Sequence, residues 1–260
     1  MIDREPTIVL EVKDHVAHLV LTRPEAANTI DLQFGREFLA AAFAIEAAAA
    51  RAVVLTGQGK NFCFGGDLKR MVASGGDVSA YLSELTTNLH AGMAHLARLN
   101  APVIAAVNGT AAGAGLGLVL MADLAIAARS AKFASAYTGV GLTPDAGVSF
   151  LLPRAVGSKR AMQLLLLNRV LDAPTALEWG LVNEVVDDAR LLETATALAS
   201  QLAAGPVGAF GAVKRLLADS QPGLEAQLGR EGRSIAARGI SAEGREGISA
   251  FLEKRAARYV

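Results

Sequence analysis

Two glycine-rich segments and one aspartate are the residues of this chain best suited to chemistry. Residues 102–117, PVIAAVNGTAAGAGLG, carry an apolar run, an Asn-Gly turn and then small residues, and residues 62–67, FCFGGD, form the second segment. Asp145 lies in the sequence TPDAG. Backbone N–H groups that no side chain covers can bind an oxyanion, and a carboxylate can accept a proton. Together they are the minimal set for removing a proton next to a carbonyl and binding the resulting oxyanion.

Each of these features also has a purely structural interpretation. Small residues between positions 109 and 117 allow a helix to pack closely on a sheet, and Asp145 stands in a sequence typical of turns and helix caps. The glycine spacing does not fit a P-loop, because no Gly-Lys-Ser or Gly-Lys-Thr follows, and it is not a convincing dinucleotide-binding fingerprint. Nucleotide hydrolysis and hydride transfer are therefore disfavoured.

The elements that must position these groups are strands that alternate with helices. Gly66, Ala114 and Asp145 each follow a predicted buried strand, and this alternation indicates an α/β fold. Beyond residue 158 the pattern becomes mainly helical, with one short strand over residues 181–186. Two earlier helices are predicted, one beginning near residue 31 and one over residues 82–99. Apolar runs predict the strands at residues 7–12, 16–22, 52–56, 102–107 and 123–128, the first two as a hairpin.

Composition narrows the classes of partner. The chain has 260 residues, 52% of them hydrophobic, which suits one domain or one domain with an appendage. Its 25 basic residues are balanced by 25 acidic ones and aromatics are 5%, so we expect no nucleic-acid partner. No signal-peptide pattern and no uninterrupted apolar stretch of about 18 residues is found, so we expect a soluble, cytoplasmic protein without a membrane partner. Cys63 is the only cysteine, which excludes a disulfide framework and a cysteine-built zinc site, and we expect no metal site.

Five segments follow one another along the chain: KNFCFGGDLKRM, APVIAAVNGTAAGAGLGLVLMADLAIAARSAKFASAY, GLTPDAGVSFLLPRAVG, ALEWGLVNEVVDD and EGISAFLEKR. This ordered set of motifs resembles the enoyl-CoA hydratase/isomerase (crotonase) superfamily over about residues 8–255. The resemblance implies an α/β spiral of repeated β-β-α units over residues 1–200 and a helical trimerisation region over residues 201–260. It also implies a coenzyme A thioester as substrate, no separate cofactor, and a homotrimer or a dimer of trimers.

Carried over by position, the resemblance implies a set of site residues. The thioester carbonyl would lie between the backbone N–H groups of Gly66 and Ala114. Phe251 and Lys254 would reach the adenine and phosphate end of the coenzyme A bound by a neighbouring subunit. The remaining substrate-binding residues would be Phe64, Asp67, Leu68, Gly113 and Tyr137.

Departures from the family pattern bear on the reaction. Hydratases of this family use two glutamates, and their positions here hold Gly117 and Tyr137. Glycine has no side chain, and a tyrosine with a pKa near 10 is a poor base at pH 7. Isomerases of the family, which include enoyl double-bond shifters and the epoxyphenylacetyl-CoA isomerase of the phenylacetate pathway, place an acid at the position of Asp145. The segments around residues 109–133 and 141–147 are most similar to the latter.

We therefore expect Asp145 to remove the proton next to the thioester carbonyl, with the enolate bound by Gly66 and Ala114. The proton would return further along the acyl chain. The apolar sequence neighbours of Asp145 are expected to raise the pKa of its carboxyl group and so make it a stronger base. These neighbours are Val140, Leu142, Ala146 and Val148.

Three other functions remain open from the sequence. One is a hydratase with replaced acids, and another is a non-catalytic acyl-CoA binder. The third is an enzyme with Asp145 as nucleophile, because 4-chlorobenzoyl-CoA dehalogenases also place an aspartate there and an aromatic residue at the position of Tyr137. Tyr137 is expected to contact substrate or to pack as a core aromatic. His90 and His95 are interpreted as structural or surface residues, and Cys63 as a small buried filler.

Overall fold

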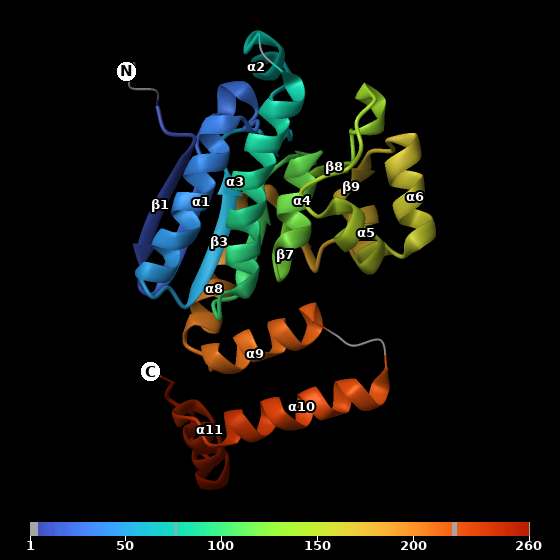
Figure 1. The fold of residues 1–260 in the computed structure, drawn as a ribbon. Helices are drawn as coiled ribbons and strands as arrows, with labels where there is room; N and C mark the ends of the chain where they lie inside the picture. The colour runs from blue at the N-terminus through green and yellow to red at the C-terminus, as the bar shows by residue number, and fades with distance from the viewer. Residues whose placement is uncertain (1–4, 76, 220–222, 260) are drawn as a thin grey trace.

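The computed structural model describes residues 5–75, 77–219 and 223–259. Within these residues, the larger of two sheets has six strands in the order β1-β2-β3-β5-β7-β10 (Figure 1). β1 and β2 form an antiparallel hairpin, and all other neighbours in this sheet are parallel. The strands are β1 (Ile8–Lys13), β2 (Val16–Leu21), β3 (Ala52–Gly57), β5 (Val103–Val107), β7 (Leu124–Ala128) and β10 (Glu184–Val186).

The smaller sheet is built from short strands that follow those of the larger one. Its order within the described residues is β4 (Asn61–Cys63), β6 (Thr110–Ala112), β8 (Lys132–Ala134) and β9 (Leu171–Asp172). In the pairs β3–β4, β5–β6 and β7–β8, the first strand joins the large sheet and the second joins the small one. Helices follow each pair, so the chain advances as a spiral of β-β-α units, and the predicted α/β fold class is confirmed. These helices are α2 (Leu68–Ala73), α3 (Val78–Arg98), α4 (Ala114–Met121), α5 (Val148–Val156) and α6 (Ser158–Leu167).

The centre of the large sheet is wholly buried. Every residue of β5 is at most 1% exposed, as expected for a parallel strand with neighbouring strands and helices around it. α1 (Leu32–Ala47) packs along α3 and on β1, while α8 (Leu191–Ala203) packs on β3, β5 and β7. The loops that follow β4, β6 and β8 are therefore held by a rigid core.

Helix starts near these loops differ in how their N–H groups are satisfied. Asp31, Asp67 and Asp77 are the N-caps of α1, α2 and α3, and each carboxylate accepts a backbone N–H two or three residues further on. α4 begins after Gly113, which has a φ of 54° and no side chain that could cap the helix. The first N–H groups of α4 are thus left for another partner.

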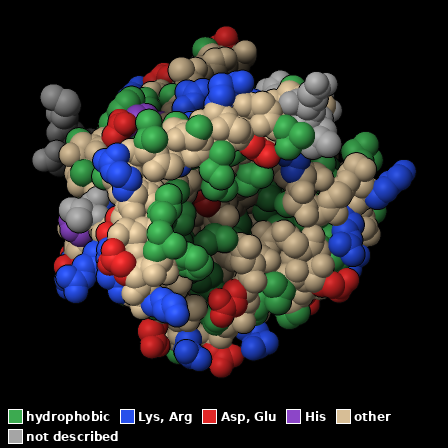
Figure 2. Space-filling model, turned by 90° about the horizontal axis from the view of Figure 1, so that it is seen from below, with side chains coloured by type: hydrophobic (Ala, Val, Ile, Leu, Met, Phe, Trp, Pro, Cys, Tyr) green, Lys and Arg blue, Asp and Glu red, His purple; other side chains and the backbone are tan. Residues whose placement is uncertain are grey.

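The C-terminal third is helical. α7 (Ala173–Glu178) precedes β10, and α8 is followed by α9 (Val207–Ala218), α10 (Leu224–Gly239) and α11 (Ala242–Glu253). α9 is fixed to the core by Lys214, whose ammonium group lies 2.8 Å from Asp123 and donates to the carbonyl of Ala101 at 3.0 Å. α10 and α11 lie below the sheets in Figure 1, and Figure 2, seen from that side, shows apolar side chains around a hollow. The predicted boundary at residue 201 falls near the end of α8.

No single helix in the described ranges has both the length and the apolar composition needed to cross a membrane. Residues Asp188–Ala203 and Val207–Ala218 meet those criteria only as a pair, and this pair is bent by 103°.

Some elements differ from the sequence prediction. The short strands β4, β6, β8 and β9 and the helices α2 and α5 were not predicted. α3 begins four residues before the predicted start, and the strand expected over residues 181–186 forms only over Glu184–Val186. Strands of two or three residues are too short to show alternation, and Pro153 inside α5 disguises a helix.

Candidate active site

One cavity of about 350 Å³ brings together the three groups that the sequence singled out. Gly66, Ala114 and Asp145 all line it. Its size and largely apolar walls suit a small-molecule site, with few polar groups to fix orientation. The apolar side chains that line it are Ile30, Phe64, Leu68, Met71, Leu82, Leu85, Leu89, Val140 and Leu142.

The backbone N–H of Gly66 is free to bind a ligand. Gly66 forms a parallel bridge with Ile30, but the hydrogen bonds of that bridge come from its neighbours. Ile30 N–H donates to the carbonyl of Gly65 at 2.7 Å, and Asp67 N–H donates to the carbonyl of Ile30 at 2.8 Å. The N–H of Gly66 itself has no acceptor among the described residues, and a Cβ built on Gly66 would meet nothing within 4 Å.

Ala114 supplies the second free N–H. It is the first residue of α4, so its N–H has no acceptor inside the helix, and none is found elsewhere in the described part of the chain. A Cβ on Gly65 would lie 3.0 Å from the backbone nitrogen of Ala114 and 2.8 Å from the carbonyl oxygen of Ala112. This backbone contact, which only glycine permits, joins the two segments whose free amides border the cavity.

Asp145 is oriented by Tyr137. The phenol of Tyr137 donates to Oδ1 of Asp145 at 2.7 Å, and the carboxylate remains 34% exposed. Burial, followed by the charge of Asp145, holds the pKa of Tyr137 far above its usual value, so this residue stays protonated and acts as a donor. Asp145 does not cap α5, because the N-cap of that helix is Gly147. The structural interpretation of Asp145 as a helix cap is therefore wrong.

His90 is a residue of the site that sequence analysis missed. Its Nε2 accepts the N–H of Ala146 at 3.2 Å and lies 3.9 Å from Oδ2 of Asp145. Ala146 is fully buried and has a φ of +47°, a conformation unfavourable for alanine, so its N–H needs this partner. Helical spacing places His90 on the same face as Thr86 and Leu82, four and eight residues earlier, but only the structure shows that this face borders the cavity.

Gly117 leaves no room for a catalytic side chain. A Cβ at this position would lie 2.5 Å from the carbonyl oxygen of Ala146 and 2.7 Å from its Cβ. The turn that carries Asp145 thus occupies the space into which a side chain at residue 117 would project. Asp67, the other carboxylate among the described lining residues, caps α2 and accepts the hydroxyl of Thr29 at 3.1 Å.

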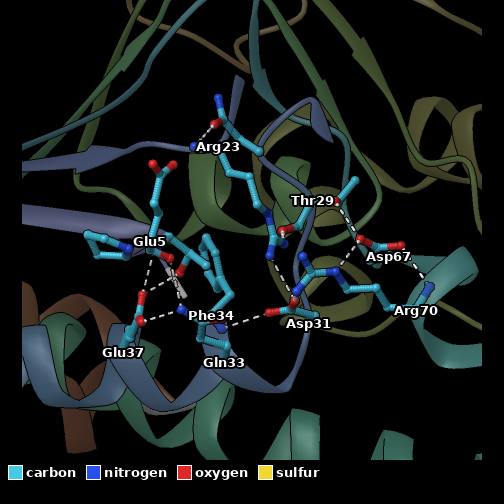
Figure 3. A network of polar contacts seen from close by, with 12 residues as sticks. Glu5, Arg23, Thr29, Asp31, Gln33, Phe34, Glu37, Asp67 and Arg70 are labelled. Atoms are coloured by element: carbon cyan, nitrogen blue, oxygen red, sulfur yellow. Dashed lines mark hydrogen bonds and ion pairs between the residues drawn. The ribbon is translucent and has the colours of Figure 1, made fainter. Parts of the chain in front are cut away.

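A buried ion network anchors the segment opposite Gly66 (Figure 3). Asp31 is 3% exposed, and its carboxylate accepts Nη1 of Arg23 at 2.8 Å and also pairs with Arg70. Burial alone would raise the pKa of Asp31, but the hydrogen bond from the Phe34 N–H and the two guanidinium groups outweigh it and lower the pKa. Asp31 is therefore ionised at neutral pH and links α1, α2 and the chain after β2.

The other predicted site residues fall into two groups. Five of them line the cavity, whereas Phe251 and Lys254 lie on and after α11, exposed to solvent and outside the cavity of their own chain. Cys63 is fully buried, and burial raises the pKa of its thiol to about 12, so it is a filler rather than a nucleophile. The five that line the cavity are Phe64, Asp67, Leu68, Gly113 and Tyr137.

Comparisons with known proteins bear on the family of this chain. The family model described as enoyl-CoA hydratase/isomerase matches residues 11–260. A probable enoyl-CoA hydratase of Rhodobacter capsulatus is 43% identical over 96% of both chains. The 1,2-epoxyphenylacetyl-CoA isomerase of Escherichia coli is 40% identical over 97% of both. 4-Chlorobenzoyl coenzyme A dehalogenase-2 of Arthrobacter sp is 38% identical over 88% of this chain and 84% of its own.

Solved structures give the same result. The crystal structure of a putative enoyl-CoA hydratase/isomerase from Mycobacterium abscessus superposes with a TM-score of 0.91 at 38% identity, covering 97% of this chain and 99% of that one. Since the family model spans nearly the whole length and relatives above 30% identity cover almost all of it, this chain belongs to the enoyl-CoA hydratase/isomerase (crotonase) family of acyl-CoA-processing enzymes.

Proposed function

We propose that this enzyme is a CoA-thioester isomerase. Asp145 removes a proton from the carbon next to the thioester carbonyl, and the N–H groups of Gly66 and Ala114 bind the oxygen of the resulting enolate. The same proton is delivered to a carbon further along the acyl group, so the double bond moves and no atom is gained or lost. The observation that carries the proposal is the position of Asp145. Among the described residues that line the cavity, it is the carboxylate that caps no helix, it accepts a hydrogen bond from Tyr137, and two free amides border the same cavity.

A hydratase is less well supported because it needs an acid and a base to add water. The position of one family glutamate is Gly117, where the Asp145 turn fills the space, and the other is Tyr137, which stays protonated. An isomerase needs only one group, since a carboxylate that accepts a proton can return it to another carbon of the same intermediate. One carboxylate and two amides are therefore sufficient.

Proton exchange at the α-carbon tests the role of Asp145 directly. In heavy water, the wild type should exchange this proton of a suitable acyl-CoA, and Asp145→Asn should lose roughly 10²–10⁴-fold in exchange rate. Affinity for the thioester should change little, because the amides of Gly66 and Ala114 remain. Asp187→Asn is the matched control, because Asp187 is 72% exposed and does not line the cavity. Near wild-type exchange by Asp145→Asn would refute the proposal.

The second candidate is a dehalogenase, which one observation favours. His90 lies 3.9 Å from Oδ2 of Asp145, so a nucleophile and a base stand side by side, and one relative is named a 4-chlorobenzoyl coenzyme A dehalogenase. Asp145 would attack the ring carbon that bears chlorine, chloride would leave, and water activated by His90 would cleave the aryl ester. Incubation with 4-chlorobenzoyl-CoA would then release chloride and leave a transient mass increase on the peptide that contains Asp145.

We also propose that the functional unit is a homotrimer, or a dimer of trimers, assembled through the C-terminal helices. Large apolar side chains on α10 and α11 are exposed in the single chain, among them Phe251 at 83%. A monomer rarely leaves such a surface in water. In the assembly, Phe251 and Lys254 would contact the nucleotide end of the coenzyme A bound by a neighbour.

A further inference from the structure

Two cavities meet at Tyr81. The active-site cavity lies on one side, and a larger hollow of about 610 Å³ lies on the other. The larger hollow is lined mainly by polar and charged residues, including Arg23, Asp31, Gln33 and Arg70. Among the described residues, Tyr81 is the only one that lines both. It therefore stands at the boundary between an apolar space and a polar one.

α2 forms the rest of this boundary. Leu68 and Met71 line the active-site cavity, whereas Arg70 and Ala73 line the polar hollow, so the two faces of one short helix border the two spaces. The ion pair between Arg70 and Asp31 ties this helix to the start of α1 (Figure 3). A wall fixed in this way cannot move aside easily, so the end of the cavity depends on Tyr81.

The residues that share the two linings with Tyr81 differ in character. Tyr81 lines the active-site cavity together with Leu82 and Leu85, and it lines the polar hollow together with Asp31 and Leu32. Burial raises the pKa of its hydroxyl, and the charge of Asp31 adds to this, while the Leu32 N–H opposes it. Tyr81 thus interacts with Asp31 and Leu32, which line the polar hollow, and also contributes to the wall of the apolar cavity.

The position of Tyr81 along α3 places it at the far end from the chemistry. Tyr81 and His90, which borders Asp145, are nine residues apart, or about 13 Å along the helix axis. The α3 residues between them that line the cavity are Leu82, Leu85, Thr86 and Leu89. The hydroxyl of Thr86 donates to the carbonyl of Leu82 at 2.8 Å, so this wall offers no free polar group to the acyl group.

We propose that Tyr81 sets the length of the acyl group that the site accepts, by closing the apolar cavity against the polar hollow. This inference rests on the proposed CoA-thioester function. The acyl groups that fit best are apolar along their whole length and end at the ring of Tyr81. Removal of the ring joins the two cavities and admits longer chains.

Binding of saturated acyl-CoAs of increasing length tests this without requiring catalysis. For the wild type, affinity should rise about four-fold for each added methylene until the chain reaches Tyr81, and then fall. Tyr81→Ala should shift the best chain length upward and strengthen binding of the next longer chains by ten-fold or more. Tyr81→Phe keeps the ring and should keep the wild-type optimum. Phe43→Ala is the matched control, since Phe43 is an exposed aromatic of α1 that lines neither cavity.

Two results would overturn the inference. One is an unchanged optimum in Tyr81→Ala, and the other is an equal loss of affinity at every length, which would mean that Tyr81 holds the coenzyme A portion. If Tyr81→Ala does not fold, Tyr81→Leu removes most of the ring and is expected to give the same shift. Failure of the wild type to bind any acyl-CoA would instead refute the proposed function, so the two failures are distinguishable.

Discussion

At the scale of single residues, the two oxygens of Asp145 have different neighbours. Oδ1 accepts the hydrogen bond of Tyr137, and Oδ2 lies 3.9 Å from Nε2 of His90, which is beyond hydrogen-bond distance. His90 instead bonds the backbone of Ala146. We infer that Oδ2 is the oxygen that carries the proton and that His90 acts by holding the turn.

If Asp145 transfers the proton and His90 only holds the turn, two substitutions of His90 should have different outcomes. His90→Gln keeps an acceptor for the Ala146 N–H, so we expect most of the isomerase activity to remain. His90→Ala leaves that buried N–H unpaired, at a cost of about 1 kcal/mol in the free energy of unfolding, and should lower kcat more than it changes KM. Steady-state kinetics and thermal unfolding of the two variants measure this. Equal loss of activity in both would mean that His90 takes protons itself, as the dehalogenase candidate requires.

At the scale of elements, the ion network around Asp31 couples the start of α1 to α2. Both helices border the boundary between the two cavities, and the Ile30 bridge to Gly66 lies directly beside this network. Breaking a buried ion pair by removing one partner is strongly destabilising, because it leaves the other charge without compensation. The network therefore contributes to the free energy of unfolding as well as to the geometry of the site.

The lowered pKa of Asp31 gives this contribution a pH dependence. A carboxyl whose pKa is lower in the folded than in the unfolded state stabilises the fold above its ordinary pKa of 3.8, and this is lost as the pH falls through the folded value. We expect Asp31→Asn to be less stable by roughly 3–5 kcal/mol at pH 7. The difference from the wild type should shrink as the pH is lowered below about 4, because Asp31 then takes up a proton first in the unfolded wild type and, at still lower pH, in the folded protein as well.

Urea unfolding of both proteins from pH 7 down to pH 3 measures that difference. Arg36→Gln is the control, because the ion pair of Arg36 with Glu84 also joins two helices but is exposed and should contribute little. A difference that stays constant over the whole pH range would show that Asp31 acts through packing alone.

The elements that sequence predicts well are those whose pattern is long. β1, β2, β3, β5 and β7 lie within one residue of their predicted bounds at each end, because five or six apolar or alternating residues define a strand. β4, β6 and β8 form only because the spiral brings neighbouring loops together, and no local sequence pattern predicts that these segments pair. α5 contains Pro153, which costs one helix hydrogen bond that packing on α4 and α6 offsets.

The candidate site follows the same rule. Gly66, Ala114 and Asp145 could be named because each combines a distinctive local sequence with a strand that precedes it. Tyr81 and His90 could not be named, since their roles depend on how α3 is rotated and on what its two ends approach. The periodicity of a helix shows which residues share one of its faces, but it does not show which other parts of the protein pack against that face.

At the scale of the whole molecule, α10, α11 and the residues between them carry large apolar side chains that the single chain leaves exposed. Phe251, Ile235 and Ile240 are each more than 70% exposed, and Figure 2 shows the apolar surroundings of this region. Burial of apolar surface drives association of chains, so an assembly through these helices lowers the free energy of the protein in water. The same helices would bring Lys254 to a neighbouring site.

Light scattering during size-exclusion chromatography tests this assembly. We expect a mass of about 81 kDa, three times the 26.9 kDa of one chain, or twice that value for a dimer of trimers. Lys254→Ala should weaken acyl-CoA binding roughly ten-fold and leave acyl-pantetheine binding unchanged, since the latter lacks the phosphates that a lysine would bind. A single-chain mass, or an equal effect on both ligands, would contradict this arrangement.

The contact between Gly65 and the start of α4 joins the two segments that carry the free amides, and it is made by backbone atoms. In the proposed mechanism the donors to the thioester oxygen are main-chain amides, so exchanging neighbouring side chains leaves the identity of these donors unchanged. The side chains that we propose to determine the reaction and the substrate lie instead on the turn around Asp145 and on one face of α3. A variant designed for another reaction could therefore receive a different turn over residues 137–147 and still retain the two amides of Gly66 and Ala114.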